Sequence, residues 1–242
     1  MAEQEVAKHT KKIYKVWNSR EHTFWQKLKE FLLEIFIIVF AITVSLWFHN
    51  RSEHEHEQEN VKDFLVGLKE DLKKDIGEMG EDKKSYENQR AIYKYIANTK
   101  PGDSLSRDTL RFYYTWILNT TGLNPNNGRF EGFKSSGKIG TIETKELQND
   151  IMDLYQENIP ALLASTNNYV SNKSRLFDYL QKNVKRLTDS TSNFAFVMNT
   201  DEAHNICLVL SFTGEINSRY DETIAKMKKI VASINAAYEL KE

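Results

Sequence analysis

The chain has one cysteine, three prolines and no excess of either charge among its 242 residues. The lone thiol, Cys207, excludes an internal disulfide framework and a cysteine-ligated zinc site. Lysine and arginine number 33 against 34 aspartates and glutamates, so the basic excess typical of nucleic-acid-binding proteins is missing, and we expect no nucleic-acid partner. Apolar residues (40%) and charged residues (28%) stand in globular proportions, with room for one anchor and one domain.

Sequence motifs of catalysis are also missing. There is no G-x-S-x-G, no H-E-x-x-H and no dinucleotide-binding fingerprint, and "SSGKIG" lacks the spacing of a phosphate-binding P-loop. His204 precedes Cys207 by three residues, but Cys207 stands in the apolar run "ICLVLSF" and is expected to pack as a small hydrophobic residue. We expect a protein that is not an enzyme, with no catalytic residue, no metal and no cofactor.

One long apolar run, "FLLEIFIIVFAITVSLWF", covers residues 31–48. As a helix it is about 27 Å long, close to the ~30 Å hydrocarbon thickness of a bilayer. Trp25 and Trp47 flank the run where interfacial aromatic residues are enriched. A buried helix of a soluble protein is the alternative; we expect one transmembrane helix. The following segment, "HNRSEHEHE", offers no small-x-small cleavage site, so we expect the anchor to be retained.

Glu34 interrupts this run, and three interpretations stand. Its carboxylate can snorkel to water or to nearby lysines, because it lies about one turn inside the cytoplasmic boundary. Alternatively, Glu34, Ala41, Ser45 and Ser52 share one helical stripe, and small or polar residues allow close helix–helix packing in lipid. This transmembrane packing face would join copies of the chain or another envelope membrane protein. The third interpretation is a proton relay, which requires partners that complete it.

Beyond the span, the sequence reads as all-α. Apolar residues recur at threes and fours from Val61, so we expect the first helix to run on to about Asn98. Further helices are expected over 104–118, 143–187, bent at Pro160, and 201–240. These predict a transmembrane helix that continues into an antiparallel helical bundle. The expected divisions are an amphipathic, basic cytoplasmic segment (1–30), the span (31–48), a charged collar (49–60) and a periplasmic bundle (61–242).

Two segments are candidates for binding. Residues 119–140 hold five of the ten glycines, and so long an irregular segment is usually functional. Its candidate ligand or partner residues are Arg129, Phe130, Phe133, Lys134, Gly137 and Lys138. In the collar, His49, Glu53 and His56 fall on one helical face, which is a metal-binding pattern. A solvated charged collar is the simpler interpretation, because the sequence shows no fourth ligand.

A family resemblance rests on two stretches. The run "EIFIIVFAITVSLWFHN" followed by "FLVGLKEDLKKDI", and later "FEGFKSSGKIGTIETKELQNDIMDLY" (130–155), resemble an uncharacterised single-span envelope family abundant in Bacteroidota. Glu34 and Ile35 match its Gly-Glu-Ile motif, whereas Leu33, Ala41, Ser45 and Arg51 depart from its pattern. The resemblance implies a Gram-negative inner-membrane location and implies no activity.

From these observations we expect a non-enzymatic, membrane-anchored scaffold or accessory subunit of an envelope complex. Its partners would be membrane lipid and further copies of itself or other envelope membrane proteins. The alternative is a sensor-like ectodomain that binds a small ligand and signals through a partner.

The distribution of basic residues yields a topology prediction. Residues 1–30 hold seven lysines and arginines, whereas residues 49–68 hold only Arg51 and Lys62, so the N-terminus should be cytoplasmic. A reporter that works only outside the cytoplasm should be active when fused after Glu242 and silent when fused at Met1. An intact but silent C-terminal fusion would contradict this orientation.

Overall fold

The structure, a computed structural model, describes residues 11, 14, 24–100, 103–187 and 192–238. These residues are all-helical and contain no strand; the only pairing of strand type among them is an isolated bridge between Arg186 and Ser192. Contacts divide the chain into an N-terminal unit, Met1–Asn60, and a C-terminal unit, Val61–Glu242. Most of the expected amphipathic segment 1–30, and the expected turn at Pro101 and Gly102, lie outside the described residues.

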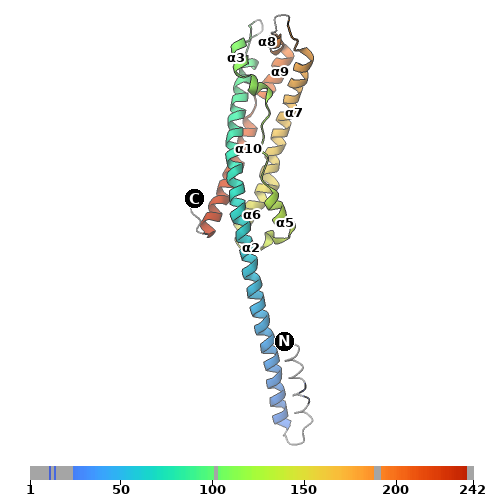
Figure 1. Cartoon of the computed structure of the whole chain (residues 1–242), viewed down its shortest axis with the longest axis vertical. Coiled ribbons are helices and arrows are strands. Elements are labelled where there is room, and N and C mark those ends of the chain that lie inside the picture. Colours follow the sequence, from blue (N-terminus) through green and yellow to red (C-terminus); the bar gives the residue numbers. More distant parts are fainter. Residues whose placement is uncertain (1–10, 12–13, 15–23, 101–102, 188–191, 239–242) are drawn as a thin grey trace. The chain divides into compact units, whose positions relative to one another are not determined.

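Helix α2 (Phe24–Ala97) is 74 residues long, and it confirms the prediction of one helix running to about residue 98 (Figure 1). It continues through Gly77 and Gly80. In the N-terminal unit its large apolar side chains are exposed, among them Phe36, Phe40 and Trp47. By length and composition, this is the one helix of the described chain that is apolar enough to cross a membrane.

The segments that follow α2 are more broken than the sequence indicates. The expected helix 104–118 is two short helices, α3 (Arg107–Phe112) and α4 (Tyr114–Leu118), which meet at Tyr113. The segment 119–140 is not irregular throughout, because it contains α5 (Gly128–Ser135) and the 3-10 helix η1 (Lys138–Thr141). Phe130 is buried and stacks on Tyr155 with ring centroids 4.2 Å apart, and such packing stabilises a short helix that local propensity does not.

The expected helix 143–187 begins as α6 (Lys145–Asp153), passes through one π-helical stretch, η2 (Leu154–Asn158), and continues as α7 (Ile159–Asn183). The π-helical stretch ends two residues before Pro160, and a proline at this point would cost a continuous α-helix one hydrogen bond and clash with the preceding turn. In this stretch the main-chain hydrogen bonds span five residues instead of the four of an α-helix.

The expected helix 201–240 is also divided. Helix α9 (Asp201–Leu210) is capped by Thr200, whose hydroxyl accepts from the Ala203 amide, and α10 (Gly214–Tyr238) starts after a three-residue break. The break frees α10 to pack Tyr220 against Tyr86 of α2, with ring centroids 5.8 Å apart. A five-residue helix before α9, α8 (Phe194–Met198), was not predicted.

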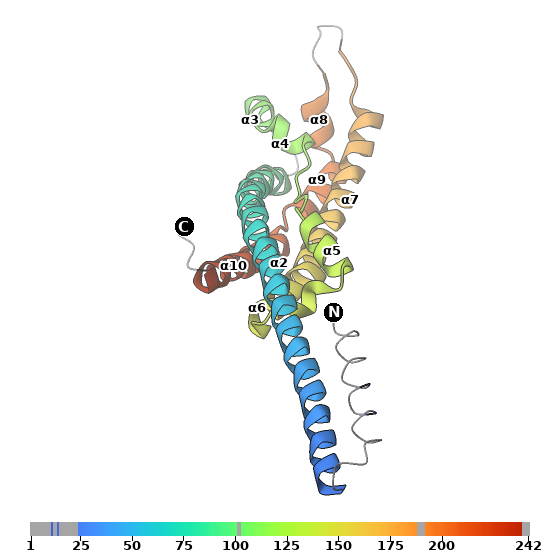
Figure 2. The same ribbon diagram turned by 60° about the horizontal axis from the view of Figure 1, so that its bottom comes forward.

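The long helices of the C-terminal unit run in two directions. Gln89 of α2 accepts from Lys173 of α7, and Asp75 of α2 acts electrostatically on Tyr155 of η2, so residue numbers rise together along α2 and α7. Helix α10 runs the opposite way, because its Tyr238 lies near Lys62 and its Asp221 pairs with Lys83 (Figures 1 and 2). Helix α10 is therefore antiparallel to both α2 and α7, the first and third of the four expected helical segments.

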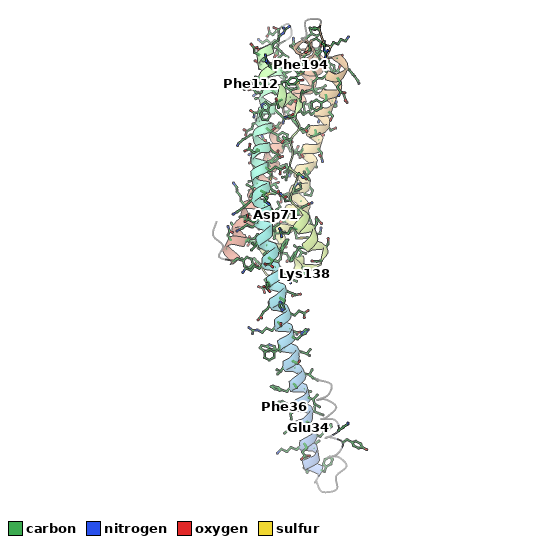
Figure 3. All side chains as sticks on the ribbon, viewed as in Figure 1. Glu34, Phe36, Asp71, Phe112, Lys138 and Phe194 are labelled. Atoms are coloured by element: carbon green, nitrogen blue, oxygen red, sulfur yellow. The ribbon has the colours of Figure 1, made fainter. Side chains whose placement is uncertain are left out.

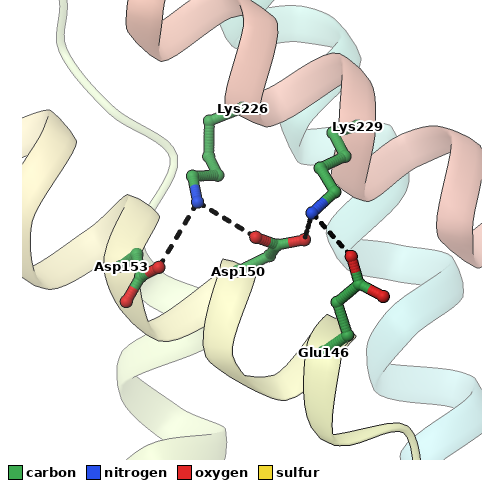
Figure 4. A network of polar contacts seen from close by, with 5 residues as sticks. All are labelled: Glu146, Asp150, Asp153, Lys226 and Lys229. Carbon is green, nitrogen blue, oxygen red and sulfur yellow. Dashed lines mark hydrogen bonds and ion pairs between the residues drawn. The ribbon is translucent and has the colours of Figure 1, made fainter.

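Helices α6 and α10 are joined by a charged network (Figure 4). The carboxylate of Asp150, which is almost fully buried, accepts from Lys226 at 3.0 Å and from Lys229 at 2.8 Å. Asp153 also pairs with Lys226, and Glu146 with Lys229. Burial acts to raise the pKa of Asp150, but hydrogen bonds from Lys229 and Lys226 outweigh it and lower the pKa below the ordinary 3.8.

The Asp150 network predicts an acid-dependent loss of stability. Asp150→Asn should lower the free energy of unfolding by roughly 1–3 kcal/mol at neutral pH, since it removes the charge from a buried partner of two lysines. Because the folded pKa is depressed, this contribution is present above pH 3.8 and is lost as the pH falls through the folded value. Urea denaturation of wild type and variant should therefore show a gap that narrows in acid.

Glu222→Gln is the matched control, because Glu222 forms an exposed pair with Arg219 within one helix. Its expected cost is below about 1 kcal/mol. An equal cost for both variants would contradict the role given to Asp150.

Candidate functional site

Residues 119–127, here called the strap, are extended and connect α4 to α5. An extended segment without a neighbouring strand must find other partners for its main-chain N–H and C=O groups. Three of these groups find side-chain partners on one side of α2, at Asp75, Glu78 and Tyr86. Further polar residues follow the same side at helical spacing and bond to other groups nearby: Asp71, Asp82, Gln89 and Tyr93.

Individual hydrogen bonds fix the strap residue by residue. The amide of Asn124 donates to Glu78 at 3.1 Å, and the amide of Asn126 donates to Asp75 at 3.2 Å. Tyr86 donates its hydroxyl to the carbonyl of Thr121 at 2.8 Å, and the Thr121 hydroxyl donates to Asp82. The strap is thus held along α2 by side chains.

Lys173 of α7 completes this arrangement and is fully buried. Its ammonium donates to Gln89 Oε1 at 2.7 Å, to the carbonyl of Trp116 at 3.1 Å and to the carbonyl of Asn119. The last two carbonyls belong to the end of α4 and the start of the strap. One side chain therefore joins α2, α4 and α7.

The groups around the Lys173 ammonium are neutral at physiological pH. Gln89 also accepts from Tyr169, and the ring of Tyr93 lies 5.8 Å from Nζ. Burial in these surroundings lowers the pKa of Lys173 to about 7. Burial raises the pKa of Cys207 to about 12, so this thiol stays protonated and unreactive at neutral pH.

A pocket of about 590 Å³ lies among α3, α4, α8 and the residues just after α7, and we call it the α3–α8 pocket. Arg107 and Arg111 stand on one face of α3, four residues apart. Tyr114 and Phe194 meet edge to face at 5.5 Å between ring centroids and form an aromatic wall. The pocket combines cationic, hydroxyl and apolar groups drawn from segments about 80 residues apart in the sequence.

Large apolar side chains are exposed on the same helices. Phe112 of α3 and Phe196 of α8 are each 75% exposed, and Tyr114 and Leu187 are also exposed. Figure 3 shows Phe112 and Phe194 at the same end of the C-terminal unit. We call Phe112, Tyr114, Leu187 and Phe196 the aromatic surface.

A second pocket of about 400 Å³, the α7–α9 pocket, lies between α7, the end of α9 and the start of α10. Its lining is mostly neutral, with Asn168 and Asn172 beside Val209 and Phe212. Ser165 of α7 donates to Glu215 of α10 at 2.9 Å across it. Phe212 is 73% exposed.

The loop residues predicted from the sequence serve packing in part. Phe133 stacks on Phe64 with ring centroids 3.9 Å apart, and Arg129 pairs with Asp71 at 2.9 Å. The Arg129 guanidinium also fills the space beside Gly67, where a Cβ would come within 2.3 Å of Cζ. Arg129 and Phe133 thus fix α5 to α2.

The other predicted loop residues occupy the end of α5 and the turn after it. Lys134 lies over the Phe130 ring, 5.6 Å from its centroid. Gly137 has φ +76°, a left-handed conformation that favours glycine, and Lys138 is exposed beside it. These residues do not enclose a pocket with the arginines of α3.

In the N-terminal unit, Glu34 is only 5% exposed and is engaged by a contact, whereas Ala41, Ser45 and Ser52 are exposed. The collar histidines stand near acids of the same helix: His49 lies 3.9 Å from Glu53. Among the residues that the structure describes, no group of three His, Cys, Asp or Glu side chains is arranged to hold a metal ion.

Sequence reasoning placed residues 119–127 in the irregular segment 119–140, but it missed their attachment to α2, the role of Lys173 and the arginine pair of α3. One signal was available: acids and an amide at positions 71, 75, 78, 82 and 89 recur at intervals of four, three, four and seven, a helical spacing that is usual for buried apolar residues. No protein-family model, curated protein or solved structure matches the chain.

The lowered pKa of Lys173 predicts that the folded protein becomes more stable as the pH rises above 7. Its folded pKa, about 7, is lower than the ordinary 10.5, so the unfolded chain binds the extra proton between these values and stability rises with pH there. Relative to Lys173→Met, which cannot titrate, the wild type should gain up to about 1.4 kcal/mol per pH unit above pH 7.

Urea denaturation of the full chain in detergent at pH 6, 7, 8 and 9 (roughly the window that the two pKa values set) measures this difference. Tyr86, Tyr93, Tyr169, Tyr220 and Cys207 titrate in both proteins, so their effects cancel. A wild-type-to-variant difference that stays constant across this range would contradict the lowered pKa.

Proposed function

We propose that this protein is a non-enzymatic scaffold or accessory subunit of an envelope protein complex, anchored by a single membrane span. The observation that carries the proposal is the aromatic surface of the C-terminal unit. Soluble monomers rarely expose clustered large apolar side chains, and such clusters mark interaction sites. Aromatic residues and arginine are also the residue types enriched in the cores of protein interfaces.

The membrane part of the proposal rests on α2. Most of its apolar side chains between residues 31 and 48 are exposed, on a helix of sufficient length, which is the arrangement that lipid stabilises. The basic excess before the span supports a cytoplasmic N-terminus and a C-terminal unit outside the cytoplasm, folded as a helical bundle. Membership of the Bacteroidota envelope family, proposed from its motifs alone, would make the location a bacterial inner membrane.

Self-association is the second kind of contact we propose. Ala41, Ser45 and Ser52 are exposed along one stripe of α2, and small residues permit close approach of two helices in lipid. Glu34 would then be a polar residue at one end of this packing face.

A sensor-like function is the second candidate, and the α7–α9 pocket favours it. Its volume lies within the range of small-molecule sites, and its amide groups suit a neutral polar ligand. A sensor of this kind would signal through a partner protein.

Two matched substitutions separate these functions. The double variant Phe112→Ser/Phe196→Ser alters the aromatic surface, whereas Phe212→Ser alters an equally exposed aromatic residue at the α7–α9 pocket. Both should fold, because exposed positions contribute little to stability. We expect the double variant to recover at least about tenfold less of the proteins that co-purify with the wild type in mild detergent.

Phe212→Ser should recover those partner proteins at the wild-type level. Both variants should also recover a co-expressed, differently tagged copy of the chain at the wild-type level, which reports self-association. The opposite pattern, loss with Phe212→Ser alone, would transfer the interface to the α7–α9 pocket. Equal recovery with both variants would refute the aromatic surface as the binding site.

A further inference from the structure

The arginines of the α3–α8 pocket differ from several other arginines of the chain. Arg51, Arg129 and Arg219 each pair with a carboxylate within 4 Å. The guanidinium groups of Arg107 and Arg111 form no ion pair or hydrogen bond with any residue in the described part of the chain. Two guanidinium groups on one face of α3 are therefore available to an external anion.

The charge around this pocket is unbalanced. Asp108 is the only acid among the described residues that line it. Lys185 and Arg186, which directly follow the lining residue Val184, are exposed and likewise have no ion-pair partner among the described residues. Among the described residues, the pocket lining and the two residues after Val184 thus carry four basic side chains against one acid, which favours a negatively charged occupant.

The pocket is also apolar in part. Leu110 is buried at its floor, and Val184, Ala195 and the pair of Tyr114 and Phe194 line it. A bare anion would leave these groups, and the exposed rings of Phe112 and Phe196, in contact with water. An occupant that covers them must carry apolar side chains next to its negative charges.

We propose that the α3–α8 pocket binds an acidic segment of a protein partner, in which carboxylates alternate with apolar side chains. Arg107 and Arg111 bind the carboxylates, and an apolar side chain enters between Val184 and the aromatic wall. Arginine suits this role because its planar guanidinium binds a carboxylate through two parallel hydrogen bonds. The proposal deepens the scaffold function and depends on it.

Three labelled peptides test the occupant on the wild-type protein in phosphatidylcholine nanodiscs. The first alternates glutamate with phenylalanine and leucine, the second replaces each glutamate with glutamine, and the third replaces each apolar residue with serine. We expect fluorescence anisotropy to show binding of the first peptide and at least about tenfold weaker binding of the other two. Equal binding of the glutamine peptide would overturn the proposal, and so would no binding of any peptide.

Charge reversal locates the site. Arg107→Glu/Arg111→Glu should weaken the first peptide on the order of a hundredfold, and Arg107→Lys/Arg111→Lys, which keeps charge but loses the bidentate geometry, by less. Arg90→Glu/Arg175→Glu makes the same charge change at exposed positions outside the pocket and should bind normally. Loss of binding with the control pair, or retention with the pocket pair, would overturn the assignment.

Three further outcomes distinguish the ways in which the proposal could fail. Complete displacement of the peptide by millimolar phosphate would show a simple anion site and overturn the proposal. Binding of the wild type to phosphatidylglycerol vesicles, if Arg107→Glu/Arg111→Glu abolishes it, would show a membrane-binding surface and also overturn the proposal. If no peptide binds while Phe112→Ser/Phe196→Ser still loses its partner proteins, the scaffold function stands and the acidic-segment proposal falls. Near-UV circular dichroism checks each variant for folding, and the peptide comparison on wild type stands even where a variant fails to fold.

Discussion

The main-chain hydrogen bonds of the strap are the constraint on which the rest of the C-terminal unit depends. An extended segment beside helices has no strand to pair with, and each buried amide or carbonyl left without a partner costs about as much as a lost hydrogen bond. Helix α2 meets this need with a row of acids and hydroxyls, and Lys173 meets it from α7. This explains why α2 carries polar residues at spacings where an ordinary core helix is apolar.

The strap also determines the order in which the helices pack. A short turn after α2 would place the next long helix antiparallel to it. Instead, the strap carries the chain back along α2, from Ile117 beside Tyr93 to Arg129 beside Asp71, before α6 begins. Helix α7 then runs in the same direction as α2, and α3 and α4 remain at the end of the unit where α8 arrives. The α3–α8 pocket is a consequence of this return.

Sequence patterns predicted the features that depend on residues close together in the chain. The apolar period was sufficient to predict how far α2 extends. Pro160 indicated a local irregularity, which is the π-helical stretch, because proline disturbs the helical turn just before it. The glycine-rich segment misled because Phe130 gains its stability from Tyr155, which is distant in sequence. The role of Lys173 could not be predicted, since its bond to Gln89 joins residues 84 positions apart. Helix α8, at five residues, is too short to show a period.

Lys173 connects the strap to the pocket in physical terms. A buried ammonium without a carboxylate partner is costly, as its lowered pKa shows, and an apolar side chain of similar volume would avoid that cost. Such a replacement, however, would leave the carbonyls of Trp116 and Asn119 without a donor, and these carbonyls fix the end of the helix that carries Tyr114 and Thr115. Burial of the Lys173 ammonium therefore lowers the stability of the unit, while its hydrogen bonds hold one wall of the pocket in place. A wall held in this way loses little conformational freedom when a partner binds, which is how a pre-organised site gains affinity.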